Sequence, residues 1–154
     1  MTSHRPRNVC TASESAVVDY LSTHGFPHAE WGALCGYRGA GDIANTPGIC
    51  WSVKVGPAAR SASDELVEDW LHELDEEADR FHSIHGILVV QRRGHGRDRV
   101  GRWWAITRLT SFMLIAGDEG SMHEWSLSRA PVRVHLADMC ELLRHAGWGT
   151  EVDT

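Results

Sequence analysis

Residues 87–90 form an uninterrupted apolar run, Ile-Leu-Val-Val, that ends at Gln91. A short run without alternating polar residues is typical of a central strand that is covered on both faces. Just before it, apolar residues recur at helical spacing from Leu66 to Phe81, after a helix start at Ser63. A chain that places such a helix before such a strand is expected to form layers of helix and sheet.

The other elements follow from capping, turn and spacing signals. Thr11 and Glu14 have the spacing of a capping box, which predicts a helix that ends at Gly25. The pattern further predicts a strand at 28–35, a hairpin within 41–54, a linker at 55–62, a strand at 102–107 after a polar turn, a helix at 110–116, a polar loop at 117–129, an edge strand around 132–134 and a helix at 136–146. We therefore expect an α/β fold with a mixed central β-sheet flanked by helices.

The size and composition are those of one soluble domain, with 154 residues, 42% hydrophobic and 23% charged. We expect 1–10 to be a flexible lead-in, 13–107 the core and 108–154 a C-terminal helical part. No apolar run approaches the roughly 18 residues of a membrane-spanning helix, so no membrane partner is expected. Four widely spaced cysteines without a C-x-x-C pair, and no secretory signal, favour the cytoplasm of a bacterium or of a phage-infected host cell.

The segment 41–54 carries the residues of clearest chemical character. Asp42 stands at the head of a short apolar strand, a Pro-Gly turn follows, and the return strand ends at Lys54. The turn should bring Asp42 beside the end of the return strand. Ser52 and Lys54 are two residues apart and therefore point to one face. Lys54 is the only lysine of the chain, and its compact ammonium group suits a water or a phosphate oxygen. The alternative is an ordinary surface lysine.

These residues, Gly41-Asp42-Ile43, the Pro-Gly turn and Val53-Lys54, resemble the PD-(D/E)xK nuclease superfamily, and within it the archaeal and phage Holliday junction resolvases. The resemblance runs from about Ser13 to about Thr107. It implies a restriction-endonuclease-like fold and a metal-dependent endonuclease that hydrolyses DNA phosphodiesters. The expected substrate is branched DNA, the expected state is a homodimer, and the expected cofactor is Mg²⁺ or Mn²⁺. In this resemblance Asp42 and the Val53 carbonyl bind the metal, and Lys54 takes the role of the lysine near the attacking water.

Ser52 departs from the family pattern, which usually has a metal-binding acid at this position. Some restriction endonucleases of the superfamily are similar in having S-V-K here and take the acid from the following helix, which indicates Glu68 as the replacement. Glu68 lies about 115° from the centre of the apolar stripe, so it could reach sideways. Glu14 and Glu30 are the other candidates. Glu14 is similar in spacing to the first-helix glutamate of the archaeal resolvases, but the capping box also explains it.

The net charge of −6 does not indicate nucleic-acid binding, but the charges are unevenly distributed. Acidic residues gather at 64–79 and arginines at 92–108. We expect the arginines of the second segment to contact DNA phosphates, together with one arginine of a glycine-rich loop: Arg92, Arg93, Arg97, Arg99, Arg102 and Arg38. For the loop arginine, exposure to solvent without a ligand is an equal alternative.

Two functions of different classes remain open. One is the metal-dependent endonuclease, and the other is a catalytically inactive protein of the same fold that binds DNA or serves assembly. A zinc-dependent or HNH-type nuclease would need clustered His and Cys ligands, and His82 and His85 lack further ligands nearby. Convergence of Asp42, Lys54 and an acid would favour the endonuclease. Residues 108–154 carry no readable motif, so core packing and a dimer surface are both open.

Overall fold

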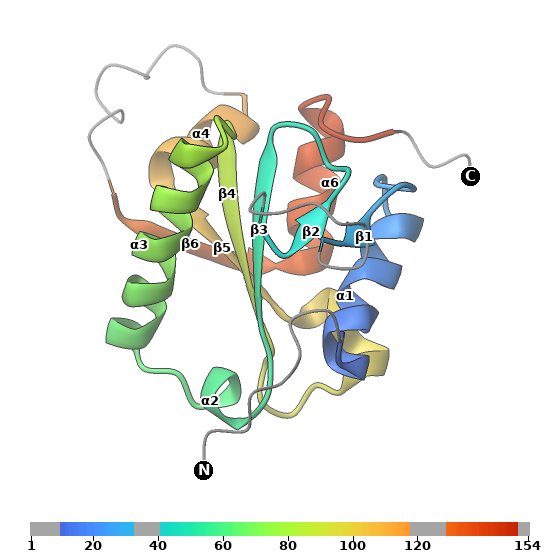
Figure 1. Cartoon of the computed structure of the whole chain (residues 1–154), viewed down its shortest axis with the longest axis vertical. Helices are drawn as coiled ribbons and strands as arrows, with labels where there is room; N and C mark the ends of the chain where they lie inside the picture. The colour runs from blue at the N-terminus through green and yellow to red at the C-terminus, as the bar shows by residue number, and fades with distance from the viewer. Residues whose placement is uncertain (1–9, 33–40, 118–128, 151–154) are drawn as a thin grey trace.

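A four-stranded mixed sheet forms the centre of the protein (Figure 1). The computed structural model describes residues 10–32, 41–117 and 129–150. The strands lie in the order β3-β4-β5-β6 and span Ile49–Lys54, His85–Val90, Trp104–Arg108 and Pro131–His135. β3 runs parallel to β4, and the other neighbours are antiparallel. The predicted mixed central sheet is confirmed.

One face of the sheet is covered by α3, Asp64–Arg80 (Figure 1). Ser63, the residue before the helix, caps its first turn, because the side-chain hydroxyl accepts a hydrogen bond from the Leu66 N–H at 3.1 Å. The apolar stripe of α3 buries Leu71 and Leu74 in a cluster with Leu88 of β4 and with residues of β3 and β5. The helix therefore connects the parallel strands β3 and β4 by crossing this face.

The opposite face is covered by α1, Ala12–Thr23, and α6, Leu136–His145 (Figure 1). They enclose a core that contains the fully buried Trp51 and Ile87. All four side chains of the run 87–90 are at most 3% exposed. The prediction of a central strand covered on both faces is thus confirmed, and burial of each such side chain contributes about 1.5–3 kcal/mol.

A two-stranded antiparallel sheet lies beside the free edge of β3 (Figure 1). It consists of β1, Glu30–Trp31, and β2, Ile43–Ala44. β1 is shorter than the strand predicted at 28–35, and residues 33–40 lie outside the described residues. β2 pairs with β1, and the bridge between Gly41 and Trp51 is parallel, so the hairpin predicted within 41–54 is corrected. Asp42 nevertheless lies beside the end of β3, as predicted.

The turn between β2 and β3 depends on Gly48. Its φ is 83°, a value that glycine adopts without steric cost. The Ile49 N–H donates to the Thr46 carbonyl at 3.1 Å and closes the turn. A Cβ at Gly48 would lie 2.3 Å from the Trp148 ring, so the position also lacks space for a side chain. The predicted Pro-Gly turn is confirmed.

Other segments differ from the prediction in detail. The expected linker contains a short helix, α2, Pro57–Arg60, because Pro57 suits the first helical turn. The arginine-rich turn contains the 3₁₀ helix η1, Arg97–Arg102. The predicted helix after β5 is present as α4, Leu109–Ile115, and the predicted edge strand is β6. Within the described ranges, no helix is long and apolar enough to cross a membrane.

Candidate active site at the free edge of β3

Asp42 is fixed beside β3 by its backbone and its side chain. Its N–H donates to the Trp51 carbonyl at 2.7 Å, and its carbonyl accepts a hydrogen bond from the Gly32 N–H at 2.8 Å. Its Oδ2 accepts a hydrogen bond of 2.7 Å from the Val53 N–H. Together these bonds hold the carboxylate next to the last residues of β3.

The backbone of Val53 faces the same edge as Asp42. The carbonyl of the next residue, Lys54, accepts a hydrogen bond from the Gln91 N–H at 2.9 Å and so faces β4. Successive residues of a strand direct their backbone groups to opposite sides, so the Val53 carbonyl lies on the free edge together with its N–H. A carbonyl and a carboxylate oxygen therefore share this edge.

The side chains at the end of β3 alternate between the two faces of the sheet. Trp51 and Val53 are buried in the core under α1 and α6, whereas Ser52 and Lys54 are half-buried. The Nζ of Lys54 lies 5.6 Å from the centre of the Trp70 ring of α3. This cation–π contact places the lysine on the α3 face and restrains it there.

The surroundings of Asp42, including two further carboxylates, raise its pKa. Burial raises the pKa of Asp42 above its ordinary value. The hydrogen bond from Val53 and the charge of Lys54 oppose that rise in pKa, while the charges of Glu77 and Glu14 add to it. An ionised carboxylate in such surroundings is unfavourable unless a positive charge compensates it, which is typical of functional sites.

Glu77 of α3 is the acid that reasoning from the sequence missed. Its Oε1 accepts a hydrogen bond of 3.0 Å from the N–H of Gly41, the residue before Asp42. At about 100° per residue, Glu77 lies on the same flank of α3 as Trp70, two turns earlier. This spacing was visible in the sequence, but the sequence did not show that this flank faces β3.

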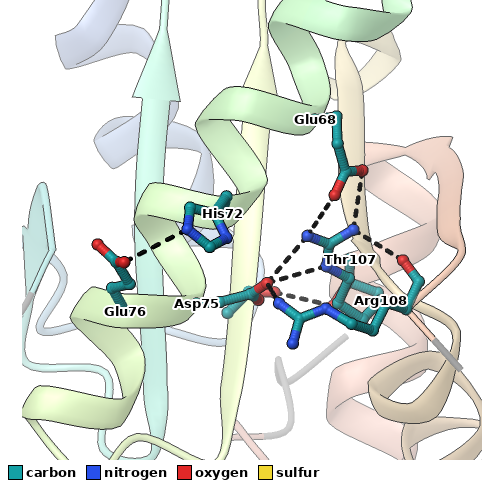
Figure 2. A network of polar contacts seen from close by, with 8 residues as sticks. Glu68, His72, Asp75, Glu76, Thr107 and Arg108 are labelled. Carbon is teal, nitrogen blue, oxygen red and sulfur yellow. Dashed lines mark hydrogen bonds and ion pairs between the residues drawn. The ribbon is translucent and has the colours of Figure 1, made fainter. Parts of the chain in front are cut away.

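Glu68 does not join Asp42, and the expectation that it replaces the missing acid is corrected (Figure 2). Its Oε2 accepts a hydrogen bond of 2.9 Å from Nη1 of Arg108, at the end of β5, and its Oε1 lies 2.8 Å from Nη2. This hydrogen bonding lowers the pKa of Glu68. Arg108 also donates to Asp75 through Nε and Nη2. Glu68 and Asp75 lie on the flank of α3 opposite to Glu77, and this flank faces β5.

The other two candidate acids have different surroundings. Glu14 completes the predicted capping box, since its Oε1 accepts hydrogen bonds from the Thr11 N–H at 3.1 Å and from the Thr11 hydroxyl at 2.7 Å. Its charge also contributes to the raised pKa of Asp42. The capping interpretation is confirmed, and a role as an active-site ligand stays a prediction. Glu30 is exposed on β1, where it pairs with Ala44.

The oxygen groups at this edge fit a hard divalent cation by their chemistry. Asp42 and Glu77 provide carboxylates, and Val53 provides a carbonyl. Mg²⁺ keeps several waters and is usually held by one or two carboxylates, so a small protein ligand set suffices. Among the described residues, however, no three His, Cys, Asp or Glu side chains are grouped to hold a metal ion. Cys50 does not contribute a thiolate, because burial raises its pKa to about 12.

The predicted DNA-contacting arginines fall into two groups. Arg92 and Arg93 follow β4 and line a pocket on the α3 face. Arg97, Arg99 and Arg102 are exposed on η1, which packs beside α1 (Figure 1). Arg38 lies outside the described residues.

Comparison with models of protein families, with curated proteins and with solved structures finds no match for this chain.

Proposed function

We propose that this chain is a metal-dependent endonuclease that hydrolyses phosphodiester bonds of DNA, with branched DNA as its substrate. The observation that carries the proposal is the hydrogen bond from the Val53 N–H to the Asp42 carboxylate, which places this carboxylate beside the end of β3 that contains Ser52 and Lys54. The order α1, β1, β2, β3, α2, α3, β4, with β4 parallel to β3, supports a restriction-endonuclease-like arrangement.

The residues of this edge have complementary roles in the proposed reaction. Asp42, Glu77 and the Val53 carbonyl would hold a divalent cation through oxygen atoms. When bound, Mg²⁺ or Mn²⁺ supplies Lewis-acid stabilisation of the phosphoryl oxygens and lowers the pKa of a bound water. Lys54 donates hydrogen bonds to the attacking water or to a phosphate oxygen, and its contact with Trp70 limits its motion.

The electrostatics of the site support a cation-binding role. The pKa of Asp42 is raised by burial, and Glu77 and Glu14 add to this rise. A bound divalent cation would remove that penalty, because it favours the ionised form of each carboxylate.

The exposed arginines of η1, Arg97, Arg99 and Arg102, are proposed to contact DNA phosphates, and a homodimer is proposed for engagement of branched DNA.

A catalytically inactive DNA-binding or assembly protein is the second candidate. Ser52 is neutral where the resembled family has an acid, and the described residues contain no ready-made group of three metal-binding side chains. In this alternative the arginines bind DNA, while Asp42 serves to join the β1–β2 sheet to β3.

Incubation of the purified protein with a four-way junction, a flap and a linear duplex tests the proposal. Cleavage is expected with Mg²⁺ or Mn²⁺, with the junction cleaved fastest, and no cleavage is expected in EDTA. Binding to the junction without cleavage under every metal condition would support the inactive alternative instead.

A further inference from the structure

A pocket of about 260 Å³ lies on the α3 face of the sheet. Its lining comes from α2, α3, the end of β4, β5 and β6, and it includes four arginines: Arg60, Arg92, Arg93 and Arg133. Gln91 and Trp104 also line the pocket. The chain thus brings four cationic side chains from distant segments to one concave surface.

Trp104 holds two of these arginines in place. The guanidinium carbon of Arg92 lies 4.2 Å from the centre of the Trp104 ring, and that of Arg133 lies 4.4 Å from it. Nη1 of Arg92 also lies 3.1 Å from Nε2 of His135. Cation–π contact and this hydrogen bond orient both guanidinium groups before any ligand arrives.

Among the described residues, none of the four pocket arginines has a carboxylate partner at ion-pair distance. The ion pairs of arginine in the described part of the chain are those of Arg108 and Arg129 with Glu68 and Asp75. Arginine stays protonated at every physiological pH. Four guanidinium groups around one cavity repel each other, so a bound dianion would be strongly favoured.

The position of the pocket is also one at which α/β sheets bind ligands. Gln91, Arg92 and Arg93 directly follow β4, at the carboxyl ends of the parallel strands β3 and β4, where ligands bind in open sheets. Lys54, Val90 and Trp104 are in register across β3, β4 and β5. Lys54 and the pocket therefore share one face, with Lys54 directly beside Val90 of the lining and about 10 Å from Trp104 across two strand spacings.

We propose that this pocket binds a phosphate monoester group, carried either by the end of a nucleic-acid strand or by a small phosphorylated molecule. A monoester carries a charge of about −1.5 to −2 at pH 7 and has three acceptor oxygens, which match several convergent guanidinium forks. A backbone diester has a single charge and fewer free oxygens. Because Trp104 already contacts two guanidinium groups, its ring positions them and does not stack on a base.

The proposal is independent of cleavage at Asp42, and its test is done in EDTA. Binding of inorganic phosphate is measured by calorimetry at constant ionic strength for the wild type, Arg133→Ala, Arg133→Lys and Arg80→Ala. Arg133 is exposed on β6, and the control Arg80 is an exposed arginine at the end of α3 outside the pocket. We expect Arg133→Ala to weaken phosphate binding by about 10- to 100-fold, as the loss of a charged hydrogen bond does.

Arg133→Lys keeps the positive charge but loses the paired N–H donors of the guanidinium group. Its affinity for phosphate should therefore lie between those of the wild type and Arg133→Ala. Arg80→Ala should bind as wild type does. An oligonucleotide with a 5′-phosphate, the same strand with a 5′-hydroxyl, and a nucleoside monophosphate then identify the source. Preference for the phosphorylated strand assigns the pocket to strand ends, and equal binding of both strands with tighter binding of the monophosphate assigns it to small ligands. No phosphate binding by wild type, or equal binding by wild type and Arg133→Ala, would overturn the proposal.

Discussion

The carboxylate of Asp42 accepts a hydrogen bond of 2.7 Å from the backbone N–H of Val53, the residue before Lys54. This bond joins a residue ahead of β2 to the end of β3 and so sets the distance between the acid and the lysine. Because β3 is an edge strand of the main sheet, its free N–H and carbonyl groups are available for such a contact. The proposed active site is therefore built on the outer edge of the main sheet, where Asp42 contacts Trp51 and Val53 of β3.

Asp42→Asn should make the protein more stable at pH 7. The pKa of Asp42 in the folded protein is raised above 3.8 by burial, so the folded state retains this proton to higher pH than the unfolded state does. Stability is therefore lost as the pH rises through the folded pKa. The neutral amide of Asn does not ionise, so its variant does not lose stability in this way. Urea unfolding should therefore give a larger free energy of unfolding for Asp42→Asn than for the wild type at pH 7, and this difference should disappear below pH 3.8. If Asp42→Asn were less stable than the wild type at pH 7, the inferred cost of burying the ionised Asp42 carboxylate would be contradicted.

Glu77→Gln should abolish metal-dependent cleavage, with a loss of at least about a hundredfold. The amide oxygen can still accept the hydrogen bond from the Gly41 N–H, but it cannot supply a charge to a hard cation. Glu73→Gln is the matched control, since Glu73 is exposed one turn earlier on α3, and it should retain activity. Adding Ser52→Glu to Glu77→Gln should restore part of the rate, because Ser52 projects on the α3 face beside Lys54. Full activity of Glu77→Gln would remove Glu77 from the site.

Arg108→Ala should destabilise the fold by about 2–3 kcal/mol, because it breaks several charged hydrogen bonds of a largely buried guanidinium group. The side chain of Arg108 is 11% exposed and binds both Asp75 and Glu68. Glu68→Gln should cost less than about 1 kcal/mol, because the Glu68 side chain is 51% exposed. It should also leave cleavage intact, unlike Glu77→Gln. Urea unfolding and the junction assay measure both effects, and an inactive Glu68→Gln protein of normal stability would restore the original assignment.

Buried His85 should make the protein less stable in mild acid. The ring is 2% exposed, and its Nδ1 lies 3.0 Å from the Ser111 hydroxyl. Burial lowers the pKa of His85 below 6.5, so the unfolded state binds the proton first as the pH falls. Stability should decline from pH 6.5 downward until the folded pKa is reached. His85→Gln should flatten this part of the pH dependence in chemical unfolding, and an unchanged slope would show that other groups cause it.

Much of the fold could be predicted because local patterns and tertiary burial agree. The run 87–90 predicts a strand, and the apolar stripe of α3 predicts a helix. Each has an apolar surface that must be buried, and the two elements are adjacent in sequence and pack on each other. Thr11 and Glu14 similarly fix the start of α1 through local hydrogen bonds alone. The two-residue strands β1 and β2 were less predictable, because a short strand carries little periodicity.

The site was only partly predictable, because its second acid, Glu77, comes from a flank of α3. The sequence shows that Glu68 and Glu77 border the apolar stripe of α3 on opposite sides. It does not show which side faces β3, since this depends on the hand of the crossover and on the order of strands in the sheet. The choice of Glu68 rested on spacing after Lys54, whereas Arg108 of β5 determines where its carboxylate lies.

The central claim is that Asp42 and Lys54 form a nuclease site, and single-turnover cleavage of a four-way junction tests it most directly. Wild type, Asp42→Asn and Lys54→Ala are compared in Mg²⁺ at equal junction occupancy, with Glu73→Gln as the control and unfolding curves recorded for each. The account predicts Mg²⁺-dependent cleavage by wild type and Glu73→Gln, and a loss of at least about a hundredfold in folded Asp42→Asn and Lys54→Ala. Cleavage at the wild-type rate by either variant, or no cleavage by the wild type, would contradict it.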